Sequence, residues 1–368
     1  GAGRPGGAYQ ARQLGLAFNA VLGVIMSLFL SLGAGTILSG VGVADALMQP
    51  AKTYLQIVGG FCILNALIPI CSSYLRAFGF SKEPLYASII GNVINFCLNA
   101  FFLFVLHKGV AGVATATVIS RIINLVIVVL LGAVLVKAKQ HPERESNRAV
   151  MGQIIRIGLP SACETAIYNV SMTLVIRFLN QMDAQGLNVT ARSYTMQITN
   201  FSYCVGAALA QANAIMTGWH IGAKEYDACD RGTKKAAVIG VIVAVILETV
   251  FTLCSGWIMQ LFSKDPQMVS LVGKLLAIDI VLEIGRVTNL VYGQALKTSG
   301  DAVFPVVMGA CFMILCSVGG TYLFGIRLGL LAVGAYIGMT GDECVRAVGM
   351  YLRWKSGKWK EKGLVKSR

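Results

Sequence analysis

The sequence of 368 residues has little charge. Only 13% of its residues are Asp, Glu, Lys or Arg, against 56% that are apolar, and the mean hydropathy is +0.69. A water-soluble domain usually carries about a quarter of its residues as charged side chains. The composition therefore excludes a soluble enzyme and predicts an all-α integral membrane protein, with the bilayer as its solvent.

Sequence patterns for catalysis and metal binding are also absent. The chain has no C-x-x-C, H-E-x-x-H, G-x-S-x-G or Walker loop, and its three histidines lie far apart. The ten cysteines are scattered along the chain, mostly inside apolar stretches, as expected for small packing residues. We expect a protein that is not an enzyme and that needs no cofactor.

Long apolar stretches are abundant instead, and each can supply the roughly 20 residues that cross a bilayer as a helix. Five stretches carry no charge in their interior: 13–44, 53–75, 84–106, 193–219 and 302–326. Five more carry one or a few ionisable residues: 110–136, 154–179, 238–261, 271–296 and 328–351. We expect ten transmembrane helices.

The net charge of +14 is distributed unevenly between the two sides of this predicted arrangement. Lys and Arg concentrate in alternate connections and in the tail after Tyr351, and such residues stay on the cytoplasmic side. The pattern predicts a multi-pass protein of the cell membrane with both ends of the chain cytoplasmic. It does not favour nucleic acid as a partner, because the charge forms no single stripe. The tail segment 354–360 suits either contact with anionic lipid or a solvated tail.

An internal repeat relates the two halves of the chain at a constant offset of 221 positions. It matches Gly1-Ala2 with Gly222-Ala223, Leu75-Arg76 with Leu296-Lys297, Gly79 with Gly300, Pro84 with Pro305, and Ala111 with Ala332. Hydropathy follows the same register, so we expect two copies of one unit. The predicted divisions are an amino-terminal bundle at 1–138, a cytoplasmic linker at 139–150, a carboxy-terminal bundle at 151–352 and a basic tail at 353–368.

The second copy has two further apolar stretches ahead of its Gly222-Ala223, whereas the sequence begins at the equivalent Gly1. We therefore expect the first two helices of the first bundle to be missing from this sequence, and six helices in each intact bundle. An even number of helices gives both copies the same orientation in the membrane, a parallel repeat of the kind found in transporters.

Several short motifs resemble the multidrug and toxic compound extrusion (MATE) family, in order and spacing, over the whole chain. They are Gly285-Arg286-x-x-Asn289, Leu296-Lys297-x-x-Gly300-Asp301-x-x-Phe304-Pro305, Leu75-Arg76-x-x-Gly79 with Pro84, Gly158-Leu159-Pro160 and Gly222-Ala223-Lys224. The resemblance implies two homologous six-helix bundles around a central cleft. It also implies export of small organic, often cationic, compounds by antiport with Na⁺ or H⁺ through alternating access, and we expect a monomer surrounded by membrane lipid.

Two other classes of function remain open. One is a lipid or lipid-linked oligosaccharide flippase of the same superfamily, although the spans carry few arginines for binding such a substrate. The other is an integral membrane enzyme or receptor, which the absence of catalytic spacing and the number of spans disfavour.

Carboxylates inside the predicted helices are the main candidates for coupling to a cation or proton, because a buried charge is costly without a role. Asp279 and Glu283 lie on one helix face with Arg286. Glu164 lies one turn after Pro160, where freed backbone carbonyls can join a cation site. We expect Na⁺ or H⁺ at Glu164 and Glu283; the alternative is a permanent ion pair with Arg286.

Polar residues near these carboxylates are candidates for the wall of a substrate cavity. They are Arg286, Asn289, Tyr168 and Asn169. For Tyr168 and Asn169 the alternative is hydrogen bonding to neighbouring helices. Tyr168 and Asn169 are candidates because they lie near Glu164, whereas Arg286 and Asn289 belong to the motif that resembles the MATE family.

Three more polar residues lie in the first copy. Asn95 and Asn99 share a helix face, and with Thr117 they resemble a coupling site of the family in which the second position is often Asp. Interhelical bonding is the alternative for all three. Glu248 and Arg121 are single charges in apolar stretches, and we expect each to form a cross-helix ion pair or to reach the interface.

Overall fold

The computed structural model describes residues 5–41, 45–136, 146–182 and 186–362, and those residues form helices and turns with no strand. The all-α prediction is confirmed. The chain divides into two compact units, Arg4–Ile154 and Ile155–Arg368, here called the first and the second unit. The predicted linker at 139–150 lies largely outside the described residues.

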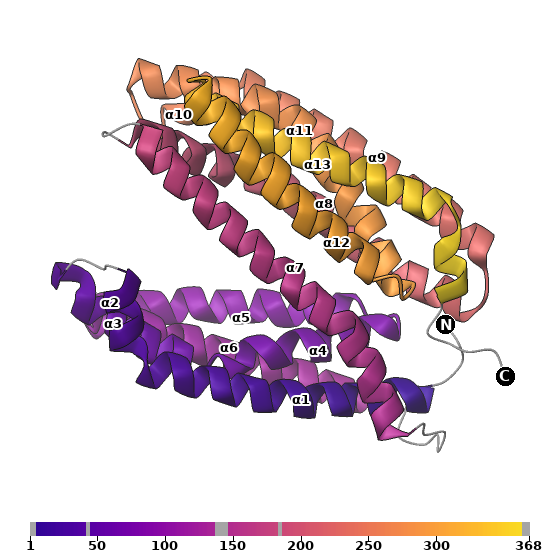
Figure 1. The fold of residues 1–368 in the computed structure, drawn as a ribbon. Helices are drawn as coiled ribbons and strands as arrows, with labels where there is room; N and C mark the ends of the chain where they lie inside the picture. The colour runs from indigo at the N-terminus through magenta and orange to yellow at the C-terminus, as the bar shows by residue number, and fades with distance from the viewer. Residues whose placement is uncertain (1–4, 42–44, 137–145, 183–185, 363–368) are drawn as a thin grey trace. The chain divides into compact units, whose positions relative to one another are not determined.

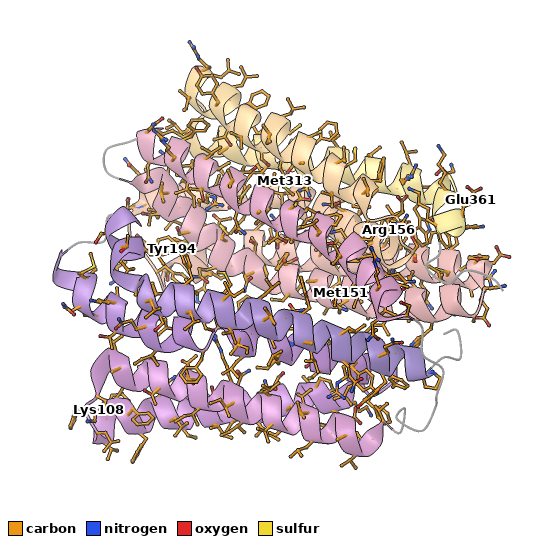
Figure 2. All side chains as sticks on the ribbon, turned by 60° about the horizontal axis from the view of Figure 1, so that its bottom comes forward. Lys108, Met151, Arg156, Tyr194, Met313 and Glu361 are labelled. Carbon is orange, nitrogen blue, oxygen red and sulfur yellow. The ribbon has the colours of Figure 1, made fainter. Side chains whose placement is uncertain are left out.

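The first unit consists of helices that pack against one another. They are α1 (Pro5–Leu32), α2 (Ala34–Val41), α3 (Asp45–Gly60), α4 (Ile63–Ala77), α5 (Lys82–Ala100) with its π-helical continuation η1 (Phe101–Val105), and α6 (Gly109–Leu135) (Figure 1). Helix α1 packs on α3 and α4, and α6 packs on α3, α4 and α5. Buried side chains such as Leu75, Ala87 and Val128 join these helices. Lys108 lies at the turn between η1 and α6, at one end of the α5–α6 pair (Figure 2).

The second unit is built around one long helix. Its elements are α7 (Asn147–Met182, which begins before the boundary), α8 (Leu187–Gly222), α9 (Tyr226–Leu253), α10 (Ser255–Met259), α11 (Pro266–Thr298), α12 (Val303–Phe312), η3 (Met313–Val318), η4 (Thr321–Arg327), α13 (Leu331–Lys355) and η5 (Lys358–Lys362). Helix α11 packs against α8, α9 and α13, and these run alongside it in Figure 1. Its buried leucines, among them Leu275, Leu276 and Leu282, pack with residues of the neighbouring helices in the core of the unit.

The internal repeat is visible in the bounds of the helices. Helices α1 and α9 begin and end 221 residues apart, and the same offset relates the starts of α3 and α11 and the starts of α5 and α12. Gly79 and Gly300 occupy the same turn with φ of 89° and 92°, a conformation that favours glycine. The two units are therefore copies of one helical design.

Five helical segments are long and apolar enough to cross a membrane on length and composition. They are Pro5–Leu32, Lys82–Val105, Gly109–Leu135, Tyr226–Leu253 and Val303–Arg327, and the bent pair Leu47–Gly60 and Ile63–Ala77 makes six if it counts as one span. Helices α7, α8, α11 and α13 fall outside this set among the described residues. The expected number of ten spans thus remains a prediction.

The outward faces carry many large apolar side chains, including Phe96, Phe104 and Leu253, the last of which is 80% exposed. Exposure of such a surface to water would be unfavourable, whereas lipid tails solvate it. The chain is a multi-pass membrane protein.

Helix η5, the last described element, folds back onto the second unit. The Trp359 ring is buried and stacks on Trp354 with ring centroids 4.1 Å apart. Asp301, in the turn after α11, accepts hydrogen bonds from Arg353 Nε and Lys362 Nζ, both at 2.7 Å. Burial raises the pKa of Asp301, but these two cations outweigh burial and hold that pKa below its ordinary value. Neither a lipid-bound nor a solvated tail describes these two tryptophans.

Candidate functional site

A cavity of about 530 Å³ opens inside the second unit, between α7, α8, α11, α13 and the α12–η3 segment, and is here called the large cavity. Its wall includes Glu164, Tyr168, Asn169, Arg286 and Asn289. The structure thus brings together the four residues predicted from sequence to line a cavity and the Glu164 carboxylate from α7. Tyr203 of α8 completes the wall beside Arg286, whose guanidinium carbon lies 6.0 Å from the centre of the tyrosine ring.

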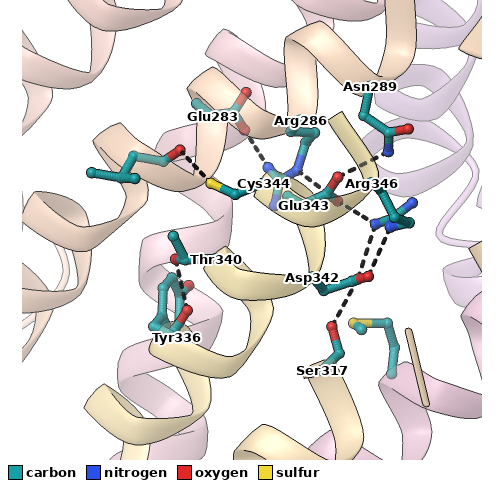
Figure 3. A network of polar contacts seen from close by, with 12 residues as sticks. Glu283, Arg286, Asn289, Ser317, Tyr336, Thr340, Asp342, Glu343, Cys344 and Arg346 are labelled. Atoms are coloured by element: carbon teal, nitrogen blue, oxygen red, sulfur yellow. Dashed lines mark hydrogen bonds and ion pairs between the residues drawn. The ribbon is translucent and has the colours of Figure 1, made fainter. Parts of the chain in front are cut away.

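The charged side chains of this wall are held in ion pairs, both across helices and within one helix. The Lys297 Nζ of α11 lies 2.6 Å from Glu164 Oε2 of α7. Arg286 donates to Glu283 on its own helix, and its Nε lies 3.7 Å from Glu343 Oε1 on α13. Asn289 Nδ2 donates to Glu343 Oε2 at 3.0 Å, as Figure 3 shows. Each charge therefore has a partner that a bound ion or substrate would have to displace.

Helix α13 contributes three ionisable residues whose site role the sequence analysis missed. Arg346 bonds Asp342 through Nε at 2.8 Å and Nη2 at 3.0 Å, and its Nη2 lies 2.9 Å from Glu343 Oε1. Ser317 of η3 donates to Asp342 Oδ2 at 2.9 Å (Figure 3). The spacing of three and four residues between these acids and Arg346 is the signal that predicts such a network.

The two carboxylates of α11 share a helix face but have different neighbours. Glu283 bonds Arg286, whereas Asp279 lines a second cavity of about 220 Å³, here called the small cavity, with Arg192 and Tyr336. Tyr168, Tyr203 and Arg286 belong to the walls of both cavities. The wall between the cavities thus contains the cation that bonds Glu283.

The structure corrects the sequence prediction for Glu248 of α9, which was a cross-helix ion pair or a side chain that reaches the membrane interface. It is fully buried, and neither of its carboxylate oxygens has a hydrogen-bond partner among the described residues. One oxygen each from Glu248, Asp279 and Glu283 lie within 4.8 Å of one another, and these residues are here called the acidic triad. Spacing along one helix gives no signal of this contact, because Glu248 comes from a different helix.

The polar residues predicted in the first unit make local bonds. Asn99 Nδ2 of α5 donates to Asn95 Oδ1 at 3.1 Å, and the Thr117 hydroxyl of α6 donates to the Val113 carbonyl at 2.9 Å. The structure places Asn95 and Asn99 together and ties Thr117 to its own helix. A coupling role for these three residues remains a prediction.

Negative charge exceeds positive charge around the two cavities and the triad. The carboxylates in this part of the described chain are Glu164, Glu248, Asp279, Glu283, Asp342 and Glu343, and the cations are Arg192, Arg286, Lys297 and Arg346. A buried carboxylate without a cation is strongly unfavourable in its ionised form. The arrangement can therefore bind protons or small cations.

Comparison with known proteins identifies relatives over nearly the whole chain. The profile of the MatE family matches residues 1–101 and 160–323. The chain is 32% identical over 364 residues to the "Uncharacterized transporter YisQ" of Bacillus subtilis, with 97% of this chain and 80% of that protein covered. It is 22% identical over 362 residues to the "Probable multidrug resistance protein NorM" of Thermotoga maritima, with 92% and 76% covered.

Solved structures share the fold. The crystal structure of the eukaryotic MATE transporter AtDTX14 superposes with a TM-score of 0.85 at 18% sequence identity, covering 98% of this chain and 82% of that chain. The family match extends over more than half of the chain and includes both units. The predicted resemblance is confirmed: the chain belongs to the MatE family and is a membrane transporter, not an enzyme.

Proposed function

We propose that the protein is a secondary active multidrug exporter, which moves organic, often cationic, compounds out of the cell in exchange for Na⁺ or H⁺. The observation that carries this proposal is the large cavity, whose wall combines tyrosines with paired charges beside an excess of buried carboxylates. Its volume lies within the range of about 300 to 1,000 Å³ that holds small organic ligands. Relatives named for multidrug resistance support the same substrate class.

The ion pairs explain how a cationic substrate and a coupling ion compete for the same carboxylates. Glu164 is held by Lys297, a cation of the protein itself, at 2.6 Å. A substrate ammonium that enters beside Tyr168 takes the place of Lys297 on Glu164. Entry of Na⁺ or H⁺ on Glu164, Asp279 or Glu283 removes the charge that holds the substrate and favours its release. Each ligand shifts the conformational equilibrium through its different affinity for the two states.

Alternating access of the two bundles completes the proposed cycle. The proposed bundles are 1–138 and 151–352, joined by a linker at 139–150 and followed by a tail at 353–368. Asn95, Asn99 and Thr117 form a second coupling region in the first bundle. The transporter works as a monomer in the cell membrane, with both ends of this chain on the cytoplasmic side, and it requires membrane lipid but no nucleic acid.

A lipid or lipid-linked oligosaccharide flippase is the second candidate. The observation that favours it is the set of cations on the wall of the large cavity, Arg286, Lys297 and Arg346, which suit a phosphate. Each of these cations is paired with a carboxylate, which lowers its availability to an anion. The exporter is therefore the preferred function.

Efflux of ethidium from cells that express the gene tests the proposal, with Na⁺ and pH gradients imposed separately. We expect efflux under one of the two gradients, and loss of efflux in Glu164→Gln and Glu283→Gln. Glu225→Gln is the matched control, because Glu225 is exposed and its partner is His220. Absence of ethidium efflux under both gradients, with the protein present in the membrane, would contradict the proposal and favour the flippase.

A further inference from the structure

We infer that the acidic triad is the seat of the coupling cation, and that Glu248 is an essential ligand of this seat. The inference rests on the proposed function, which it extends by placing the ion apart from the substrate. The ligand is a small monovalent cation, either Na⁺ or a proton shared by the carboxylates. Arg286 bonds Glu283 of this seat and also lines the large cavity.

The triad has the geometry of an oxygen site. Three carboxylate oxygens from two helices, α9 and α11, lie within 4.8 Å of one another. One hard cation can contact all three, since oxygen ligands stand about 2.3–2.6 Å from an ion such as Ca²⁺. The donors are all oxygens, and hard cations prefer oxygen ligands.

The second observation is that four oxygens of the triad lack a hydrogen-bond partner among the described residues. Both oxygens of Glu248, Oδ2 of Asp279 and Oε2 of Glu283 are buried and lack a hydrogen bond among the described residues. The Ser202 hydroxyl of α8 is also buried, lies near the Glu248 carboxylate and offers a fourth oxygen. Native proteins rarely leave so many buried polar atoms unsatisfied in one place, unless an unseen ligand satisfies them.

The charges around the triad require such a ligand. The nearest cation is Arg286, which bonds Glu283 and is shared with Glu343 of α13. Arg192 of α8 and Tyr336 of α13 face Asp279 from the small cavity. Three ionised carboxylates beside one shared arginine cannot all stay charged in a buried site, so at least one proton or cation is held there.

The internal repeat shows that the fold does not need these acids. At the offset of 221 the triad corresponds to Ser27, Val58 and Cys62, which are all uncharged. The first unit packs the equivalent helices α1, α3 and α4 with these residues in place. A purely structural reason for three buried acids in the second unit is therefore weak, and a ligand explains them better.

Arg286 connects this seat to the substrate. It lines both cavities and bonds Glu283, so a cation that arrives on the triad through the small cavity weakens the Arg286–Glu283 pair. Arg286 is then free to strengthen its contact with Glu343, now 3.7 Å away, in the wall of the large cavity. A cationic substrate meets more positive charge there and leaves.

Cation binding to the purified, detergent-solubilised transporter tests the inference, with Glu248→Gln as the variant. Thermal stability is measured against NaCl at constant ionic strength, with choline chloride as the balancing salt, and proton release on addition of ethidium is measured in weak buffer. If Na⁺ is the ligand, we expect the Na⁺ concentration that stabilises the protein to be at least about tenfold higher for the variant than for the parent, as for loss of a metal-binding group. If a proton is the ligand, we expect the variant to release fewer protons than the parent when ethidium is added.

Two controls separate a ligand from a structural residue. Without Na⁺, Glu248→Gln should be at least as stable as the parent, because an uncompensated buried charge is removed. Glu248→Ser places the residue of the first unit, Ser27, at the equivalent position and should give the same loss of binding. Parental Na⁺ response and proton release in both variants would overturn the inference.

The outcomes also separate this inference from the proposed function. If the parent protein binds the cation but does not move ethidium, and Glu248→Gln loses the cation binding, the result would support the seat and contradict the exporter. Gradient-driven ethidium efflux that Glu248→Gln leaves at the parental rate would support the exporter and overturn the seat.

Discussion

The two units share one helical design but differ in what lies at its centre. In the first unit the helix pair α3 and α4 is bent by 41° at a break, and the Ser27 hydroxyl accepts a hydrogen bond from the Ile63 N–H at 3.1 Å. In the second unit α11 runs unbroken from Pro266 to Thr298 through the equivalent positions. Glu248 stands in place of Ser27, and Glu283 in place of Cys62.

The difference teaches that one backbone plan supports either a broken helix with neutral partners or a continuous helix with buried charge. A break exposes backbone groups that need partners, and Ser27 supplies one. A continuous helix satisfies its own backbone and leaves side chains free to hold a ligand. The second unit thus contains the chemistry that the first unit lacks at the same positions.

The largest expected effect comes from removing the central cation of the second unit. Arg286→Ala leaves Glu283 and Glu343 without their shared partner, which we expect to lower stability by about 3–5 kcal/mol. Asn65→Ala, at the equivalent position of the first unit, should cost far less. Thermal unfolding in detergent, followed by size-exclusion chromatography, compares them; equal losses would show that the two centres do not differ.

The next largest loss of stability is expected from a methyl group added at Gly285, where α11 crosses α13. A Cβ at Gly285 would lie 2.8 Å from the backbone nitrogen of Cys344, whereas the first unit has Leu64 at the equivalent position. We expect Gly285→Ala to cost about 1–3 kcal/mol by overpacking. Gly341→Ala, where no atom lies within 4 Å, is the control on α13. The same unfolding measurement applies, and two variants of equal stability would mean that the helices separate without cost.

The Asp301 clamp is the third difference, since the first unit has Phe80 at that position. The pKa of Asp301 is lowered, so its contribution to stability is complete above the ordinary value of 3.8 and disappears as the pH falls through the lowered value. We expect Asp301→Asn to cost about 1–3 kcal/mol at pH 7, through loss of bonds to charged groups. The gap from the parent should close below pH 3.8 in thermal scans at a series of pH values; a constant gap would contradict the clamp.

The smallest effect is expected at the amide pair of the first unit. Asn99→Leu removes one bond to Asn95 on the same helix and should change stability by less than about 1 kcal/mol. Ethidium efflux of the same variant tests the coupling role proposed for these amides. Unchanged efflux would assign coupling to the second unit alone.

The sequence predicts the fold well because its signals are local or periodic. Apolar length predicts helices, and the offset of 221 predicts two units whose helix bounds match. Within the site, one helix face correctly places Arg286 beside Glu283. Contacts between helices are different: the pairing of Glu164 with Lys297 and the approach of Glu248 to Asp279 depend on tertiary packing that spacing along one helix does not encode.

Exchange of a cation for substrate at the buried carboxylates of the second unit is the central step of the proposed transport cycle. Its most direct test uses proteoliposomes with an ethidium gradient and no initial ion gradient, in which movement of Na⁺ or H⁺ is measured in the direction opposite to ethidium. We predict such counter-movement for the parent protein and none for Glu283→Gln. Ethidium movement without any Na⁺ or H⁺ counter-flow, or an unchanged counter-flow in Glu283→Gln, would contradict the account.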